Sequence, residues 1–168
     1  FDPCVRGTAL NLLYLVHSDA SLLFVSNLLL SSTVSTWQGE HYEYHGMCDL
    51  ELVSDPTFAG GKGLDVHIRT DIVRQWSYIK TAALRIGDDI LEVEGGGNEN
   101  RYWFNKEYQG ELTTIGGFPI KYSKADSKGR RFNGKGRLFK IDLGDGEELQ
   151  VRTFKKFVRV DFKNPKKS

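Results

Sequence analysis

One short stretch of the chain contains most of the side chains that could carry out chemistry. Residues 36–52, TWQGEHYEYHGMCDLEL, hold two of the four histidines, one of the two cysteines and four acidic residues. Histidines spaced as His41 and His45 share one face of a helix and can bind zinc there. The alternation of polar and apolar residues predicts a strand instead, on which residues four apart lie about 13 Å from each other. We therefore expect His41, Glu43 and His45 to be exposed side chains and not metal ligands.

Cys48 is the second candidate, as a catalytic nucleophile. It falls on the apolar side of the same expected strand, where a thiolate is disfavoured. No third residue that would orient a base beside it is evident in the sequence. A buried thiol, or one half of a disulfide, is the better interpretation. We predict no catalytic and no cofactor-binding residues.

Acidic residues gather in the C-terminal part of the chain and raise the question of calcium. Asp142, Asp145, Glu147 and Glu148 offer the oxygen ligands that calcium prefers, but their spacing differs from that of a calcium-binding loop. The Asp145-Gly146 pair is typical of a hairpin turn, which is a sufficient explanation of the cluster. Asp142 and Asp145 remain weak metal candidates, and no bound metal is predicted.

A basic group lies at residues 127–140, SKGRRFNGKGRLFK. Arg130 and Arg131 at its centre could attract an anionic glycan or a lipid headgroup, and a solvated loop is the alternative. Across the whole chain the formal net charge is only +1. That value argues against a nucleic-acid binder, because such proteins carry a clear basic excess.

The chain divides by charge near residue 34. Residues 1–33 contain three charged side chains and the apolar run ALNLLYLVHSDASLLFVSNLLL, which Asp19 interrupts. An aspartate at the centre of a membrane span costs about 2.5–3.5 kcal/mol. A signal or anchor segment, a packed helix, an unstructured segment and a translation artefact of a fragmentary gene all remain open. We expect residues 1–33 to lie outside the β-domain and to be dispensable for its folding, and residues 163–168 to form a basic tail.

From Trp37 onward the sequence alternates with a period of two, as half-buried strands do. In GLDVHIRT, residues 63–70, the apolar positions are expected to face inward and the polar ones outward. Residues 77–93 predict two strands joined near Gly87, residues 137–154 predict a hairpin that turns at Asp145-Gly146, and residues 157–162 predict a last strand. Such closely spaced turn signals favour an all-β, antiparallel sandwich or barrel.

The order of these stretches resembles a von Willebrand factor type D domain over roughly residues 34–162. Trp37 and Gly39 match that family's aromatic-x-Gly unit, and the aromatic strand of the family matches at Tyr42 and Tyr44. The family's Gly-x-Cys-x-aliphatic-x-Leu unit begins here at Gly46. The resemblance implies an antiparallel β-sandwich in which six residues have structural roles: Trp37, Gly39, Tyr42, Tyr44, Gly46 and Cys48.

Three features of the family's pattern are missing. The aspartate that binds calcium in calcium-binding members corresponds to Ser31 here, and neither the later C-G-N-like segment nor a C-x-x-C motif occurs. The resemblance therefore implies that calcium is not bound tightly. It also implies that Cys48 has no disulfide partner within this sequence.

The sequence thus predicts a non-enzymatic adhesion or protein-interaction module, secreted or on a membrane-anchored ectodomain. Its partner would be an extracellular protein or matrix component, with an anionic glycan or lipid as a further ligand and membrane contact through residues 1–33 alone. A lipid- or glycan-binding module and an enzyme with a site not evident in the sequence are the alternatives. The residues expected to form the interaction surface are His41, Glu43, His45, His67, Arg69, Arg130 and Arg131.

Overall fold

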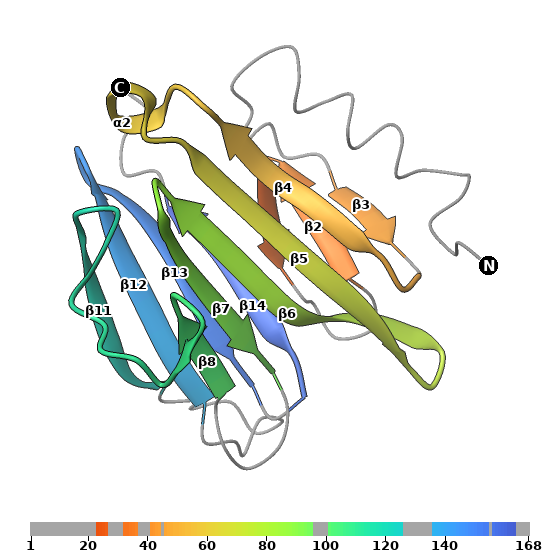
Figure 1. Cartoon of the computed structure of the whole chain (residues 1–168). Coiled ribbons are helices and arrows are strands. Elements are labelled where there is room, and N and C mark those ends of the chain that lie inside the picture. The colour runs from red at the N-terminus through yellow and green to blue at the C-terminus, as the bar shows by residue number, and fades with distance from the viewer. Residues whose placement is uncertain are drawn as a thin grey trace.

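The structure is a computed structural model, and it describes residues 23–26, 32–36, 41–44, 46–95, 101–125, 136–154 and 156–163. For the first three ranges and for residues 124–125 it describes the backbone alone. Most of these residues lie in strands, so the predicted all-β fold class is confirmed (Figure 1). The described part of the chain contains one short helical turn, α2 (Phe58–Gly61).

The strands form two antiparallel sheets. The six-stranded sheet has the order β4-β5-β6-β7-β8-β9, and the eight-stranded sheet has the order β10-β11-β12-β13-β14-β1-β2-β3. The strands of the six-stranded sheet are β4 (Asp49–Asp55), β5 (Leu64–Val73), β6 (Trp76–Ile86), β7 (Asp89–Glu94), β8 (Arg101–Phe104) and β9 (Glu107–Tyr108). Those of the other sheet are β10 (Thr114–Ile115), β11 (Phe118–Ala125), β12 (Gly136–Gly144), β13 (Glu147–Thr153), β14 (Val158–Lys163), β1 (Leu23–Ser26), β2 (Ser32–Thr36) and β3 (His41–Tyr44).

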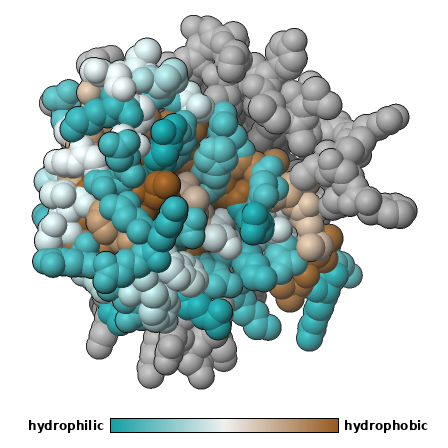
Figure 2. Space-filling model, viewed as in Figure 1, coloured by the Kyte–Doolittle hydropathy of each residue, from teal (hydrophilic) through white to brown (hydrophobic). Residues whose placement is uncertain are grey.

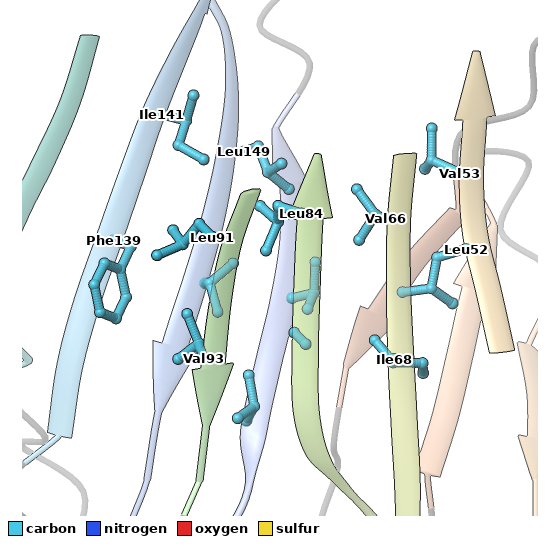
Figure 3. Packing of buried hydrophobic residues seen from close by; sticks show 14 of the residues in the cluster. Leu52, Val53, Val66, Ile68, Leu84, Leu91, Val93, Phe139, Ile141 and Leu149 are labelled. Atoms are coloured by element: carbon cyan, nitrogen blue, oxygen red, sulfur yellow. The ribbon is translucent and has the colours of Figure 1, made fainter. Parts of the chain in front are cut away.

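The hydrophobic core lies between the two sheets. Leu84 and Leu91 project into it from the six-stranded sheet, and Phe139, Ile141 and Leu149 project into it from the eight-stranded sheet (Figure 3). All five are fully buried, and burying one such side chain stabilises a fold by about 1.5–3 kcal/mol. The inward and outward alternation predicted for residues 63–70 is confirmed, and so are the turns at Gly87 and at Asp145-Gly146.

The N-terminal segment contributes to the β-domain. Strand β1 is hydrogen-bonded between β14 and β2, with Val25 opposite Val160. The prediction that residues 1–33 lie outside the β-domain is therefore wrong for Leu23–Ser26 and for the start of β2. An apolar segment can thus supply a strand even where the sequence shows no alternation.

The chain changes sheets at Gly46. Strand β3 pairs with β2 in the eight-stranded sheet, whereas β4 pairs with β5 in the six-stranded sheet. This change of sheet interrupts the strand expected over residues 36–52. His41 and Glu43 on β3 and Glu51 on β4 therefore belong to different sheets and do not share one polar face.

Candidate functional site

The outward side of the six-stranded sheet carries ordered rows of polar and aromatic side chains, and we call it the outer face. Cross-strand pairing places residues from successive strands side by side along each row. The first row is Asp49, Arg69, Thr81, Glu94 and Arg101. The second row is Glu51, His67, Ala83, Glu92, Trp103 and Tyr108. Figure 2 shows that hydrophilic side chains predominate on this side, with hydrophobic ones between them.

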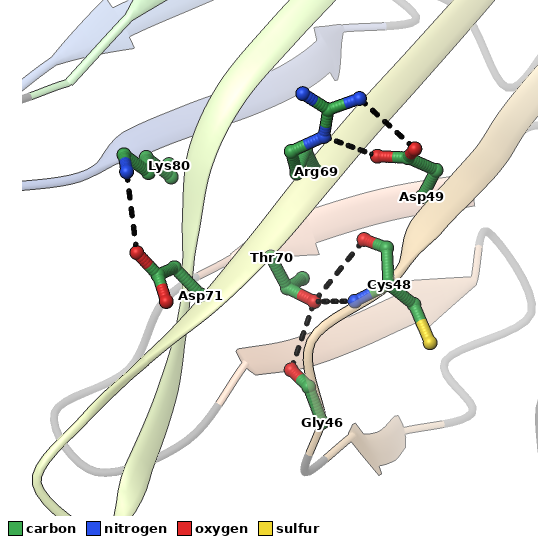
Figure 4. Close-up of polar contacts among 7 residues, drawn as sticks. All are labelled: Gly46, Cys48, Asp49, Arg69, Thr70, Asp71 and Lys80. Atoms are coloured by element: carbon green, nitrogen blue, oxygen red, sulfur yellow. Dashed lines mark hydrogen bonds and ion pairs between the residues drawn. The ribbon is translucent and has the colours of Figure 1, made fainter. Parts of the chain in front are cut away.

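A bidentate ion pair stands at one end of the first row. Arg69 Nε donates to Asp49 Oδ1 at 2.6 Å and Arg69 Nη2 donates to Asp49 Oδ2 at 3.0 Å (Figure 4). The hydrogen bonds from Arg69 lower the pKa of Asp49, and those to Asp49 raise the pKa of Arg69. Both side chains are exposed, so the pair adds little to stability. Its main effect is to fix the direction of both charges.

Other charged residues of the outer face also have partners across the strands. Arg101 Nη1 lies 3.4 Å from Glu94 Oε2, and His67 Nε2 lies 3.8 Å from Glu51 Oε2. Arg85 donates to Asp65 in the row beyond. Strand register sets every one of these pairs, so the positions of these charges on the outer face follow from the pairing of the strands.

A shallow hollow lies between the ion pairs. It has a volume of about 310 Å³ and is lined by Asp49, His67, Ile68, Arg69, Thr81, Ala83 and Glu92. Thr81 and Ala83 are short side chains on the central strand β6, flanked by longer ones on β5 and β7, which is why the surface is hollowed there. Glu92 is exposed and joins none of the ion pairs found among the described residues.

An aromatic pair borders the hollow. Trp103 stands directly opposite Glu92 across β7 and β8, and its ring lies 5.6 Å from the ring of Tyr108. Trp103 is half-buried and Tyr108 is 48% exposed. An exposed carboxylate therefore has an aromatic ring on one side and the Arg69–Asp49 pair on the other.

Buried hydroxyl groups hold the chain where it enters the six-stranded sheet. Ser77 Oγ accepts a hydrogen bond from Gly46 N at 2.6 Å and donates to Gly46 O at 2.9 Å. Thr70 Oγ1 accepts from Cys48 N at 2.9 Å and lies 2.9 Å from Gly46 O (Figure 4). Side chains thus form hydrogen bonds with the backbone N–H and C=O groups that are not paired between strands here. These bonds fix the position at which β4 begins with Asp49.

Cys48 is buried and disulfide-bonded. The prediction that it has no partner within the chain is therefore wrong, while the interpretation of Cys48 as half of a disulfide is confirmed. Cys4, the other cysteine of the sequence, lies outside the described residues.

The structure divides the residues expected to form the interaction surface. His67 and Arg69 lie together on the outer face, whereas His41 and Glu43 belong to β3 in the other sheet. His45, Arg130 and Arg131 lie outside the described residues, as do Trp37 and Gly39. Tyr42 and Tyr44 pair with Val34 and Ser32 on β2.

The metal candidates occupy a hairpin. Asp142 Oδ1 accepts a hydrogen bond from Gly144 N at 3.1 Å, and Asp145 lies in the turn with a φ of 50°. Within the described ranges, no three His, Cys, Asp or Glu side chains are grouped so that they could hold a metal ion. No helix in the same ranges has the length and apolar character needed to cross a membrane.

Sequence reasoning missed Glu92 and the hollow between the rows. The alternation of β7 did mark Glu92 as outward, but its neighbours across the sheet depend on strand register. A small residue between two larger ones on a central strand, as at Ala83, is the signal that could have indicated the hollow. Comparison of the chain with protein-family models, with curated proteins and with solved structures found no match in any of the three.

Proposed function

We propose that the chain is a non-enzymatic, extracellular protein-interaction module of the von Willebrand factor type D kind. It binds its partner protein through the outer face, and a basic side chain of the partner enters the hollow. The observation that carries this proposal is the exposed carboxylate of Glu92, which lies between Trp103 and a hollow whose other charges are already paired.

The chemistry around Glu92 fits a lysine or an arginine of the partner. Arg69 is bound at two atoms to Asp49, so Glu92 is available to form a new charge-assisted hydrogen bond. Residues directly opposite on adjacent strands have Cβ atoms about 4.5–5.5 Å apart, which puts the Trp103 ring within reach of a cation held by Glu92. A cation over an indole face gains further stabilisation.

The outer face also combines the two kinds of residue that protein interfaces use. Trp, Tyr and Arg provide most of the binding energy in such interfaces, and Trp103, Tyr108 and Arg101 lie on this side of β8 and β9. Charged groups around them set the orientation and the rate of encounter. The rows of fixed ion pairs supply these groups without a large ordering cost on binding.

One feature supports the extracellular location, and a second supports the family assignment. Disulfides persist in oxidising compartments outside the cytosol, and Cys48 is disulfide-bonded. Gly46, Cys48, Leu50 and Leu52, which carry the resemblance, occupy the junction between the sheets, where the last three are buried.

The hollow favours binding over catalysis. Its one hydroxyl side chain is Thr81, and among the described hydrogen bonds and ion pairs His67 is joined to Glu51 and not to Thr81. A nucleophile needs a base within hydrogen-bonding reach, and this pair lacks that arrangement.

A binding screen with matched variants tests the proposal. The full chain, Glu92→Gln and Lys121→Ala would be applied to an array of extracellular protein domains, Lys121 being an exposed cation on the other sheet. Partners bound by the wild type should be kept by Lys121→Ala and bound about tenfold more weakly by Glu92→Gln, as is typical of a charged interface contact. Equal binding by all three proteins would refute the assignment of this face. Turnover of a substrate that is lost in His67→Ala would refute the non-enzymatic assignment.

A further inference from the structure

Strands β5 and β6 continue past their neighbours as a two-stranded ribbon, residues 70–80. The last residue of β5 that pairs with β4 is Arg69, and the last residue of β6 that pairs with β7 is Thr81. Beyond them Thr70 to Val73 pair only with Trp76 to Ile79 among the described strands. Figure 1 shows the resulting hairpin projecting from one end of the two sheets.

The root of the ribbon is held firmly. Thr70 at the root and Ser77, which lies opposite Ile72 nearer the tip, are the buried hydroxyl residues that form hydrogen bonds with Gly46 and Cys48. Ile79 is fully buried, and Lys80 Nζ lies 3.3 Å from Asp71 Oδ2 across the two strands. The tip is therefore presented by a rigid support and keeps its direction.

The tip exposes apolar side chains around a basic residue. Ile72 is 46% exposed, and Val73 and Trp76 are half-buried. Arg74 lies in the turn, is exposed and joins none of the ion pairs found among the described residues. The ribbon holds one acidic and two basic side chains, a net charge of +1, and the acidic one is paired with Lys80. Hydrophobic side chains gather at this end of the molecule in Figure 2.

The turn keeps Arg74 at a conformational cost. Its φ is 62°, in the left-handed region that favours glycine. A hairpin of two central residues usually places Gly, Asn or Asp at such a position. A residue held in an unfavourable conformation at an exposed tip points to a role for its side chain.

We propose that the ribbon tip docks on the surface of an anionic lipid membrane. Ile72 and Val73 enter the boundary between headgroups and acyl chains, Trp76 lies at the level of the headgroups, and Arg74 binds lipid phosphate. Tryptophan is enriched at this depth of a bilayer, and apolar burial combined with basic charge is what holds proteins at anionic membrane surfaces. The positive tip complements such a surface, whereas a protein groove would have to match one aromatic, two aliphatic and one basic side chain together. The proposal thereby adds a membrane contact at the ribbon, which the sequence did not indicate.

Vesicle sedimentation with the full chain tests this inference. The probes are vesicles of phosphatidylcholine with and without phosphatidylserine, at low and at high salt. Wild type should sediment with the anionic vesicles, and salt should weaken the association because it screens the charge of Arg74. Ile72→Asp should lower the partition coefficient about tenfold, and Arg74→Gln should lower it about fivefold.

Tyr108→Asp is the matched control, because Tyr108 is as exposed as Ile72 but lies on the outer face. Tyr108→Asp should leave sedimentation with anionic vesicles unchanged. Sedimentation therefore tests the ribbon tip alone, and the screen with Glu92→Gln tests the protein-binding face. Near-ultraviolet circular dichroism of each variant checks that it is folded. Brominated lipids should quench wild-type fluorescence, and this quenching should be lost in Trp76→Phe.

Three results would overturn the inference. Ile72→Asp could sediment like the wild type, Tyr108→Asp could lose as much binding as Ile72→Asp, or the chain could bind neutral and anionic vesicles equally. Capture of a protein partner that Ile72→Asp abolishes, with no vesicle binding by wild type, would assign the tip to a protein groove instead.

Discussion

The two ends of strands β5 and β6 present opposite kinds of surface. On the outer face, neighbouring strands give most charged residues a partner, as in Arg69 with Asp49, and Glu92 is the exposed carboxylate left outside the pairs found among the described residues. On the ribbon, neighbouring strands have ended and the tip combines Ile72, Val73 and Trp76 with the unpaired charge of Arg74 among the described residues. Strand pairing therefore decides which surface is charge-balanced and which is apolar and basic. The same two strands can serve two ligands of different chemistry.

The largest expected effect separates the root of the ribbon from its tip. Ile79 is 0% exposed and Ile72 is 46% exposed, so Ile79→Ala leaves a cavity whereas Ile72→Ala does not. Ile79→Ala should lower the free energy of unfolding by about 2–5 kcal/mol, and Ile72→Ala should change it by about 0.5 kcal/mol or less. Denaturant unfolding of both variants measures the difference. Equal losses would show that the tip is packed like the core.

An intermediate effect is expected at the turn of the ribbon. Arg74→Gly should raise the free energy of unfolding by about 1 kcal/mol, because glycine adopts a positive φ without steric cost. The same substitution should weaken sedimentation with anionic vesicles. Unfolding and sedimentation of one preparation check both outcomes. A loss of stability would contradict the strain assigned to Arg74, and a gain in stability without weaker binding would remove its role in docking.

The smallest effect is expected on the outer face and depends on pH. The hydrogen bonds from Arg69 lower the pKa of Asp49 below the ordinary value of 3.8. The carboxylate is thus favoured in the folded state, so its stabilising contribution is present above the unfolded pKa and is lost as the pH falls through the lower folded pKa. Because the pair is exposed and screened, Asp49→Asn should cost about 0.5 kcal/mol or less at neutral pH.

Unfolding of Asp49→Asn and wild type at pH 7 and at pH 2 measures this contribution. The difference between the two proteins should be present at pH 7 and vanish toward pH 2. A difference that grows as the pH falls would contradict the sign assigned to Asp49. Asp49→Asn should lower the free energy of binding to extracellular partners by more than it lowers the free energy of unfolding, since the Asp49–Arg69 pair borders the hollow.

Much of the fold could be predicted from alternation within each strand. Residues 64–69 alternate cleanly, and their faces are as predicted. The change of sheet at Gly46 could not be predicted, because the apolar positions run on with the same period from Tyr44 through Cys48 to Leu50. The bulge between Glu51 and Val53 also breaks the pattern, so that Leu52 and Val53 are both buried.

The candidate site depends on relations that alternation does not contain. His67 and Arg69 were identified as outward, but their neighbours Ala83 and Thr81 on β6 follow from strand register. Buried polar residues on the other sheet were missed for a related reason. Gln150 and Asp161 occupy positions that alternation assigns to solvent, and burial raises the pKa of Asp161 although Arg159 Nε donates to it at 2.7 Å.

One measurement tests most directly the claim that the two regions have separate ligands. Each of the three tryptophans gives one indole N–H signal in a nitrogen-15 NMR spectrum, and Trp103 and Trp76 report on the outer face and on the ribbon. Titration with N-acetyl-arginine amide should shift the Trp103 signal and leave Trp76 in place, and bicelles containing anionic lipid should do the reverse. Movement of both signals with either ligand, or no response of Trp103 to the arginine compound, would contradict the account.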